Sequence, residues 1–255
     1  MNEKVIPIQA NSYDTLDFVH PKCVSVYKKV GYTPLQVVEE IRPYLLHDET
    51  KKITYAGRLD PMAEGWMHVL WSGDVQEKND LMNLDKTYEI EVVLGIQTDT
   101  SDALGIIESV SDVCEHKDVK SFIGPYVRPY PKYSSRNIKK TLKNDEPDGG
   151  TIAIQKGYIY DVLEKEERLV DSSGMEKNIF EKLSLSRMPG DFRMSDIIES
   201  WKRFFRDTKK ESYLVRTLII SCASGTYMRT IAHDLGGFAL SIKRIGFGKF
   251  VQMEK

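Results

Sequence analysis

The stretch ITYAGRLDPMAEGWMHV, residues 53–69, places an arginine, an aspartate and a proline among apolar residues. Burying Asp60 in such a setting without a partner would be costly, because an isolated carboxylate loses its hydration and needs a cation or several hydrogen-bond donors. Arg58 stands two positions before it, and Arg229 could approach it from far along the chain. An ionised carboxylate beside a guanidinium is a candidate catalytic pair.

A structural explanation of Asp60 competes with the catalytic one. Aspartate followed by Pro61 is typical of a helix start. Gly65 follows closely, however, and a glycine there disfavours the helix that Asp60 would cap. A hydrolase in which Asp60 acts with His68 or His233 is a further alternative, supported only by proximity in sequence. These residues by themselves leave all three interpretations open.

Arg229 lies in SCASGTYMRTIAHDLG, residues 221–236, where a β-rich strand runs into small residues and then a helix. Backbone N–H groups and an arginine near a helix start suit an anion. An arginine that extends from a helix face to solvent is the alternative. His233 and Asp234 resemble a catalytic couple, but adjacent helical residues do not face each other, so we expect His233 to be structural.

A basic segment, RPYPKYSSRNIKKTLK at residues 128–143, holds six basic residues and no acidic one. Tyr130 and Tyr133 stand among its cations, which include Lys139. Cations neutralise phosphates and aromatic rings stack on unpaired bases, so the segment is a candidate RNA-binding surface. A solvated basic loop is the alternative.

The elements around these residues follow local patterns. Alternation predicts a strand at residues 86–94, with Tyr88, Ile90, Val92 and Leu94 on one face, followed by a polar loop, TDTSDALG. A helix that begins at Pro34 is also predicted, with Thr33 as its N-cap. Its expected apolar face consists of Leu35, Val38, Ile41 and Leu45.

Further elements are expected in the second half of the chain. They are a helix from Ser195 or Asp196 to Phe205, a strand at 214–222, a turn at 223–226, a helix closed by Gly236-Gly237, and a last strand at 241–250. Residues 143–151 are the expected flexible turn cluster. Interspersed strands and helices predict an α/β or α+β fold with a mixed sheet.

Bulk composition narrows the functional classes. The 255 residues suit one large domain or two small ones, and 41% apolar with 29% charged residues is an ordinary globular mixture. No apolar run is long enough to span a membrane, and the N-terminal residues do not resemble a signal peptide. Three separated cysteines fit reduced thiols in the cytoplasm, and scattered histidines predict no metal site. The net charge of −2 is weak evidence against RNA binding, since an average can hide a basic patch.

Five motifs together resemble the TruB family of tRNA pseudouridine synthases. In chain order they are KKVGYTPLQVVEEIR (28–42), YAGRLDPMAEGWMHVLWSGD (55–74), LDKTYEIEVVLGIQTDTSDALG (84–105), PYPKYSSRNIKK (129–140) and CASGTYMRTIAHDLG (222–236). They are similar to that family's K-P-x-G-x-T-S, GTLDP-x-A-x-G, D-K-x-Y with T-D-T-x-D-x-x-G, P-P-x-Y-S-A-x-K and G-T-Y-I-R-T segments. Their order and number identify the chain as a member of the family.

The resemblance implies a pseudouridine synthase fold, with a mixed, mostly antiparallel central sheet flanked by helices and loops. Residues 1–255 would form a single catalytic domain, and the C-terminal PUA domain of many relatives would be absent. The expected enzyme is a monomeric cytoplasmic isomerase without cofactor. Its expected substrate is tRNA, at uridine 55 of the T-loop.

Roles for four residues follow from the resemblance. Asp60 matches the family's catalytic aspartate, which acts in its ionised form as a nucleophile or a base. Arg229 matches the arginine that pairs with this carboxylate. Tyr88 matches the tyrosine that stacks on the extruded base and serves the final proton transfer. Ile242 is expected to form the apolar wall.

Two departures from the family pattern affect RNA contacts. Tyr55 stands where the family has a histidine that helps to displace the base, and Arg58 replaces a smaller residue. We expect RNA-binding functions for six residues: Tyr55, Arg58, Lys86, Tyr133, Lys139 and Ile242. The alternatives are an RNA-binding or RNA-folding protein with the same fold, and a synthase that acts on another RNA site.

Overall fold

A computed structural model describes residues 16–20, 23–45, 52–71, 75–112, 116–133, 154–187, 193–247 and 250–251. Within these ranges, none of the helices combines the length and apolar character needed to cross a membrane. The predicted turn cluster at 143–151 and Lys139 lie outside the described residues.

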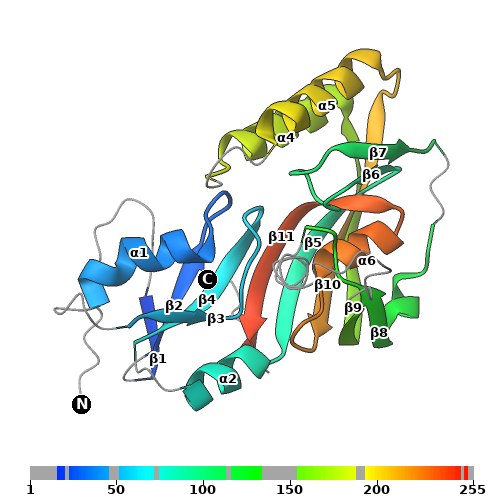
Figure 1. The fold of residues 1–255 in the computed structure, drawn as a ribbon. Coiled ribbons are helices and arrows are strands. Elements are labelled where there is room, and N and C mark those ends of the chain that lie inside the picture. The colour runs from blue at the N-terminus through cyan, green and yellow to red at the C-terminus, as the bar shows by residue number, and fades with distance from the viewer. Residues whose placement is uncertain are drawn as a thin grey trace, which may run out of the picture.

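A ten-stranded sheet forms the centre of the molecule (Figure 1). Its main path runs β1 (Leu16–His20), β2 (Cys23–Lys28), β4 (Ala63–Leu70), β11 (Gly237–Phe247), β5 (Lys86–Leu94), β10 (Ser212–Cys222), β9 (Ile154–Asp171) and β8 (Gly124–Pro129). In addition, β3 (Thr54–Ala56) pairs with β4, and β12 (Phe250–Val251) pairs with β11. The β11–β4 pair is parallel and the other pairs are antiparallel, which confirms the predicted mixed, mostly antiparallel sheet.

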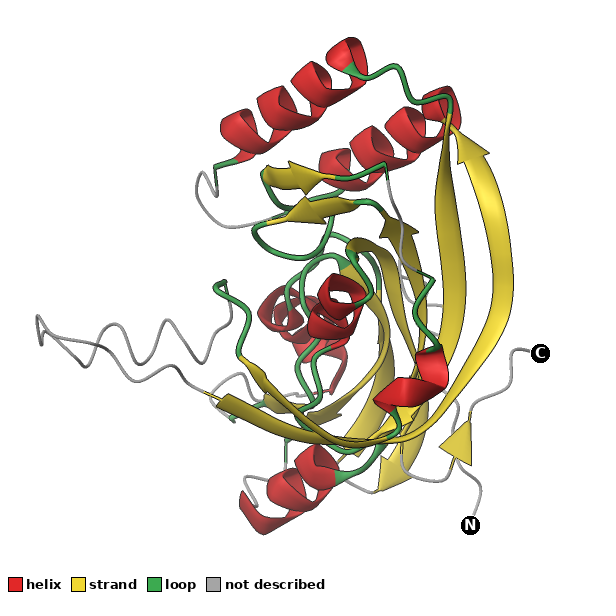
Figure 2. Ribbon diagram, turned by 90° about the vertical axis from the view of Figure 1, so that its right-hand side faces the viewer, coloured by secondary structure: helices red, strands yellow, loops and turns green. Residues whose placement is uncertain are grey.

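The helices lie on and around this sheet. They are α1 (Pro34–Leu45), α2 (Val75–Asn83), the 3-10 helix η1 (Val119–Phe122), α4 (Ser172–Ser184), α5 (Met194–Asp207) and α6 (Met228–Asp234). Figures 1 and 2 show the sheet curving around α6, while α4 and α5 lie side by side at one end of the molecule. A small separate sheet pairs β6 (Ile96–Thr98) with β7 (Ile107–Val110).

The strand predicted at residues 86–94 is confirmed as β5. Its face with Tyr88, Ile90, Val92 and Leu94 packs into a core cluster that also contains Met228 and Ile231 of α6. Gly95 ends the strand with a φ of 84°, a left-handed conformation that glycine adopts without strain. Alternation therefore fixed which face of β5 carries Tyr88.

Helix α1 begins where predicted, and one residue of its expected apolar face is exposed. The Thr33 hydroxyl accepts a hydrogen bond from the Gln36 amide (3.3 Å), and the Gln36 side chain accepts one from the Thr33 amide (2.8 Å), which is a capping box. Leu35, expected on the apolar face, is 58% exposed. Val38 and Ile41 are buried as predicted, and Val37 joins them in one continuous stripe at helical spacing.

Two predicted element starts in the second half of the chain differ from the structure. Helix α5 begins at Met194 with Arg193 as its N-cap, and neither Ser195 nor Asp196 caps it. The last long strand, β11, begins at Gly237, four residues before the predicted 241, because Gly236 already turns the chain with a φ of 84°. The predicted strand, turn and helix around 214–236 are present as β10 and α6.

Helix α4 and most of the 18-residue strand β9 were not predicted. The Asp171 side chain caps α4 through the Gly174 amide, at 2.8 Å. A second core cluster joins α4 and α5 to the sheet, and its members include Met62, Ile179, Leu183 and Trp201. The chain segment that follows Asp60 is therefore packed against the α4–α5 pair.

Candidate active site

Asp60 lies in a turn between β3 and β4, and no helix begins at Pro61. The turn is closed by a hydrogen bond from the Ala63 amide to the Asp60 carbonyl, at 3.0 Å. The Asp60 side chain is 31% exposed, so the carboxylate is only partly buried. Partial exposure leaves one side of the carboxylate free to face a substrate.

A buried lysine supports this turn from behind. The Lys28 ammonium donates to the carbonyls of Ala63 (2.6 Å) and Pro61 (3.3 Å). Burial lowers the pKa of Lys28 to about 7, although the charge of Asp60 opposes that shift. Lys28 lies in the first of the five motifs, but its contact with the Asp60 turn spans more than 30 residues and could not be read from spacing.

Arg229 lies in the first turn of α6 and forms an ion pair with Asp60. Its Nε donates to Asp60 Oδ2 at 2.8 Å, across 169 residues of sequence. Its Nη1 and Nη2 donate to the carbonyls of Thr100 (2.9 Å) and Tyr133 (3.4 Å). Burial lowers the pKa of Arg229, but the charges of Asp60 and Asp102 outweigh it and raise the pKa. The guanidinium is fixed by three segments and stays charged.

Asp102 is a second carboxylate beside Arg229 that the sequence analysis did not select. Its Oδ1 accepts from the Thr100 hydroxyl (2.6 Å) and the Leu104 amide (2.9 Å). Burial raises the pKa of Asp102, and Arg229 opposes that rise. The segment TDTSDALG was expected to be a polar loop, whereas Thr98, Thr100 and Asp102 are buried. The segment contacts Arg229 of α6 and pairs with Ala239 of β11, and local polarity does not predict these contacts.

Tyr88 projects from β5 next to Arg244 of β11, its partner in strand register. The Tyr88 hydroxyl is hydrogen-bonded to Arg244, and burial raises the Tyr88 pKa while Arg244 lowers it. Arg244 is itself buried and donates to the carbonyls of Trp66 and Gly57, both at 2.7 Å. The sequence analysis did not select Arg244, because only the β4–β11–β5 strand order brings it next to Tyr88.

Gly65 allows this strand order. It has a φ of +119°, and a Cβ there would lie 2.2 Å from the Arg244 carbonyl oxygen. Any side chain would therefore push β4 away from β11.

These residues share one cavity of about 510 Å³, a size that suits a small organic ligand. The predicted residues that line it are Tyr55, Arg58, Asp60, Lys86, Tyr88, Arg229 and Ile242. Lining residues that the sequence analysis did not select include Lys78, Met82, Ser224, Tyr227 and Arg244. The cavity therefore joins an anion–cation pair with an aromatic ring and an apolar wall.

Two of the basic side chains predicted to bind RNA, Arg58 and Lys86, differ in their exposure to solvent. Arg58 is exposed, and its Nη2 lies 3.3 Å from the Tyr55 hydroxyl. Lys86 is buried, and its ammonium donates to the carbonyls of Met82 and Leu84. Burial lowers the Lys86 pKa to about 8. Arg58 is placed to meet a phosphate, whereas Lys86 also holds the end of α2 against the cavity.

Tyr133 stands behind the ion pair and does not line the cavity. Its carbonyl accepts from Arg229, and the guanidinium of Arg193 lies 4.2 Å from its ring centroid. The Tyr133 backbone thus contacts the candidate catalytic arginine. The sequence analysis predicted that the Tyr133 ring stacks on RNA bases, and it did not predict this backbone contact.

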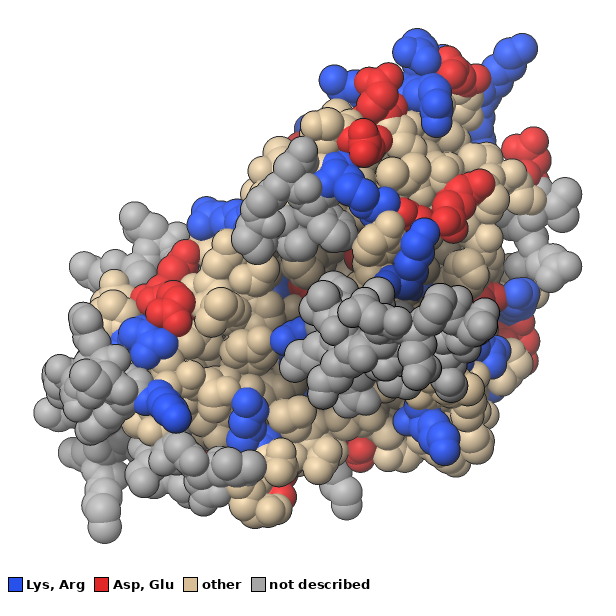
Figure 3. All heavy atoms as spheres, in the orientation of Figure 1, with Lys and Arg blue, Asp and Glu red and all other residues tan. Residues whose placement is uncertain are grey.

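Figure 3 shows the face of the molecule seen in Figure 1. Lysine and arginine atoms are scattered over this face, and at the α4–α5 end they are mixed with acidic atoms.

The histidines of the hydrolase alternative are not placed beside Asp60. His68 Nδ1 is hydrogen-bonded to the Ser25 hydroxyl (3.0 Å), and its ring stacks on Phe247 with centroids 4.0 Å apart. His233 contacts the Gln97 side chain. Neither histidine lines the cavity that Asp60 faces.

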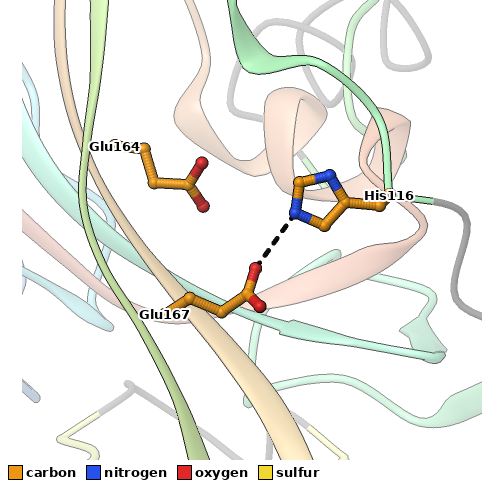
Figure 4. A group of neighbouring side chains, drawn as sticks. All are labelled: His116, Glu164 and Glu167. Carbon is orange, nitrogen blue, oxygen red and sulfur yellow. Dashed lines mark hydrogen bonds and ion pairs between the residues drawn. The ribbon is translucent and has the colours of Figure 1, made fainter.

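His116, Glu164 and Glu167 form a group whose ligand-type atoms lie within 4.8 Å of one another (Figure 4). Both oxygens of Glu164 already accept from the buried Arg216, at 2.6 and 2.9 Å. His116 is hydrogen-bonded to Glu167 at 3.2 Å. A bound cation would face the Arg216 guanidinium, so this group fits an ion-pair network between β9 and β10 better than a metal centre.

Comparison with known proteins bears on these residues. Residues 45–143 match the family model of the TruB family pseudouridylate synthase N-terminal domain. A tRNA pseudouridine synthase B of Clostridioides difficile (strain 630) is 28% identical over 221 residues, which cover 85% of this chain and 60% of that relative. The chain therefore contains a region that is similar to the TruB family.

A second relative and one solved structure are also similar to this chain. A tRNA pseudouridine synthase B of Staphylococcus saprophyticus is 29% identical over 220 residues, which cover 83% of this chain and 59% of that relative. The chain thus spans about 60% of the length of these two relatives. A chain in the crystal structure of a Cbf5-Nop10-Gar1 complex has a similar fold, with a TM-score of 0.51 and 16% identity, covering 91% of this chain and 50% of that chain. The matched TruB domain contains Asp60 and Tyr88, whereas Arg229 lies beyond it.

Proposed function

We propose that this protein is an RNA pseudouridine synthase of the TruB family, which isomerises uridine to pseudouridine with Asp60 as its catalytic carboxylate. The observation that carries the proposal is the 2.8 Å ion pair between Asp60 and Arg229 at a cavity that Tyr88 also lines. A carboxylate that is paired on one side and open on the other is suited to attack or to remove a proton.

The reaction rearranges one nucleoside and consumes no other reactant. The bond from the ribose C1′ to the base N1 breaks, the base rotates, and a bond from C1′ to C5 forms. The C5 proton is then lost, and N1 gains a proton. Asp60 would act on the sugar or base as a nucleophile, or remove the C2′ proton as a base. Arg229 would hold the Asp60 carboxylate in place in either case, through the 2.8 Å hydrogen bond from its Nε to Asp60 Oδ2.

A uridine within structured RNA must leave its stack to reach Asp60, at a cost of a few kcal/mol. Tyr88 presents a ring to the cavity, and Ile242 lines it as an apolar wall. Stacking on Tyr88 would recover part of the cost of flipping. The Tyr88 hydroxyl would also serve the final proton transfer. Tyr55 and the exposed Arg58 stand together at the cavity and would hold the RNA from which the base was taken.

The proposed substrate is tRNA, at uridine 55 of the T-loop. The support is the name of the relatives, tRNA pseudouridine synthase B, and the five motifs shared with that family. Arg58 and the basic segment at 128–143 would supply phosphate contacts.

The test uses tRNA transcripts that carry tritium at uridine C5. The wild-type protein should release tritium to water, Asp60→Asn should not, and Asp80→Asn on the surface of α2 should behave as wild type. A second transcript with cytidine at position 55 should release nothing. Release that persists with this transcript would indicate another target uridine. Binding without release from either transcript would refute the enzyme and leave the RNA-folding alternative.

A further inference from the structure

The helices α4 and α5 are inserted between the paired strands β9 and β10, and their facing ends return to the candidate active site. We propose that residues 185–187 and Arg193, which we call the brace, position Asp60 against Arg229 from outside the cavity. This inference rests on the proposed function and adds positioning residues to it.

One end of the brace holds the turn that carries Asp60. The Arg187 amide donates to the Gly31 carbonyl at 2.9 Å, and the Gly31 amide donates to the Pro61 carbonyl at 2.8 Å. Gly31 has a φ of +91°, and a Cβ there would lie 1.9 Å from the Leu185 carbonyl oxygen. Only glycine permits this close contact, which links α4 to the residue next to Asp60 through two hydrogen bonds.

Side chains strengthen the same end. The Arg187 guanidinium lies 4.1 Å from the centroid of the Tyr32 ring, within the range of a cation–π interaction. The Gln36 side chain donates to the Arg187 carbonyl at 2.9 Å. Met62, two residues after Asp60, packs in the same core cluster as Leu183 of α4. The Asp60 turn is therefore held on its outer side by this end of the brace.

The other end of the brace holds the acceptors of Arg229. Arg193 Nη1 forms an ion pair with Asp99 Oδ2 at 2.7 Å, and the same guanidinium lies 4.2 Å from the Tyr133 ring centroid. Asp99 adjoins Thr100, and the carbonyls of Thr100 and Tyr133 both accept from Arg229. Arg193 thus fixes both segments that orient the catalytic arginine.

Arg193 has a backbone conformation consistent with this function. It is a non-glycine residue in the left-handed region, with a φ of 50°, and it caps α5 without a side-chain hydrogen bond to the helix. Its side chain is directed to Asp99 and Tyr133 instead. Residues held in such conformations gather where the surrounding structure imposes them.

Positioning matters because catalytic groups must be held within a fraction of an ångström, and a displacement of about 1 Å can lower a rate on the order of 100-fold. Asp60 comes from a turn between strands, and Arg229 comes from a helix 169 residues away. The brace contacts the supports of both groups and lines no part of the cavity. Arg193 should therefore affect the chemical step and leave RNA affinity unchanged.

The test measures single-turnover tritium release with saturating tRNA, and RNA affinity separately. Arg193→Ala should lower the rate constant on the order of 10- to 100-fold with an unchanged Kd, and Arg193→Lys should recover most of the rate. Asp99→Asn, which removes the same ion pair, should lower the rate too. The double variant should lose no more than Arg193→Ala alone. Arg206→Ala, an exposed arginine of the same helix, is the matched control.

Hydrogen exchange separates this inference from the proposed function. Arg193→Ala should speed exchange in residues 99–106 and 131–133 while β5 and β10 stay protected, whether or not the protein has activity. A wild type that releases no tritium would refute the function, and unchanged exchange in both segments would refute the brace. A parental rate for both Arg193→Ala and Asp99→Asn would refute the brace as well. If Arg193→Ala does not fold, the Asp99→Asn and Arg193→Lys variants decide the question by the same measurements.

Discussion

Asp102 Oδ2 lies 3.8 Å from Arg229 Nε, the same atom that donates to Asp60 Oδ2 at 2.8 Å. One buried guanidinium therefore stands between two carboxylates. Asp102 is 5% exposed, whereas the Asp60 side chain is 31% exposed and faces the cavity. The two acids share a cation, but only Asp60 is open to a substrate.

Asp102→Asn should lower the rate of tritium release about tenfold, or ~1.4 kcal/mol of transition-state stabilisation. Without Asp102, Asp60 alone neutralises Arg229 and is held more tightly, so its carboxylate is less free to react. RNA affinity should not change, because Asp102 does not line the cavity. Asp118→Asn, a cap of the short helix η1, is the control. A parental rate in Asp102→Asn would show that the second carboxylate has no part in the reaction.

Tyr88→Phe should bind tRNA as wild type does but lose turnover, because the ring remains while the hydroxyl is gone. A fall on the order of 100-fold in the single-turnover rate is expected for a lost proton-transfer group. Tyr213→Phe is a matched control, since Tyr213 is a buried tyrosine of β10 outside the cavity. Equal rates for Tyr88→Phe and Tyr213→Phe would remove the proton-transfer role.

His68 should make stability depend on pH. Burial, with the charges of Arg244 and Lys86, lowers its pKa from 6.5 to about 4. The folded state then binds fewer protons than the unfolded state between about pH 4 and 6.5. The free energy of unfolding should fall as the pH drops through that window, by about 3 kcal/mol for this residue.

Urea unfolding at several pH values checks this expectation. His68→Asn should flatten the slope between pH 4 and 6.5, even if it lowers stability at neutral pH. Ser25→Ala removes the hydrogen-bond partner of His68 but leaves the ring buried, so it should keep the slope. An unchanged slope in His68→Asn would mean that other groups cause the acid sensitivity.

Arg58→Ala should weaken tRNA binding and reduce the salt dependence of log Kd by about one unit of slope, because one phosphate contact is lost. Lys177→Ala on α4, which is 76% exposed, should leave both unchanged. Binding measured over a series of salt concentrations gives the comparison. Replacement of Lys139 and Lys140 by alanine is predicted to act like Arg58→Ala, and a parental slope there would leave that segment as a solvated basic loop.

Local sequence patterns determined the position of several helices and strands. Alternation along residues 86–94 placed Tyr88 on the buried face of β5, and Thr33 with Pro34 marked the start of α1. The five motifs selected Asp60, Tyr88 and Arg229, which the structure brings to one cavity. Their assigned functions stay predictions until the variants are measured. Sequence gave these results because capping, strand alternation and motif spacing depend on neighbouring residues.

Only the tertiary structure decided the partners of these groups. Arg244 meets Tyr88 because β11 lies between β4 and β5, and Asp102 meets Arg229 because α6 packs over the segment after β6. The contacts of Arg193 with Asp99 and Tyr133 likewise join segments 94 and 60 residues apart. Such pairings depend on strand order and on how helices dock, and neither is encoded in the spacing of nearby residues. The sequence therefore selected the candidate side chains, and the fold determined which charged groups contact them.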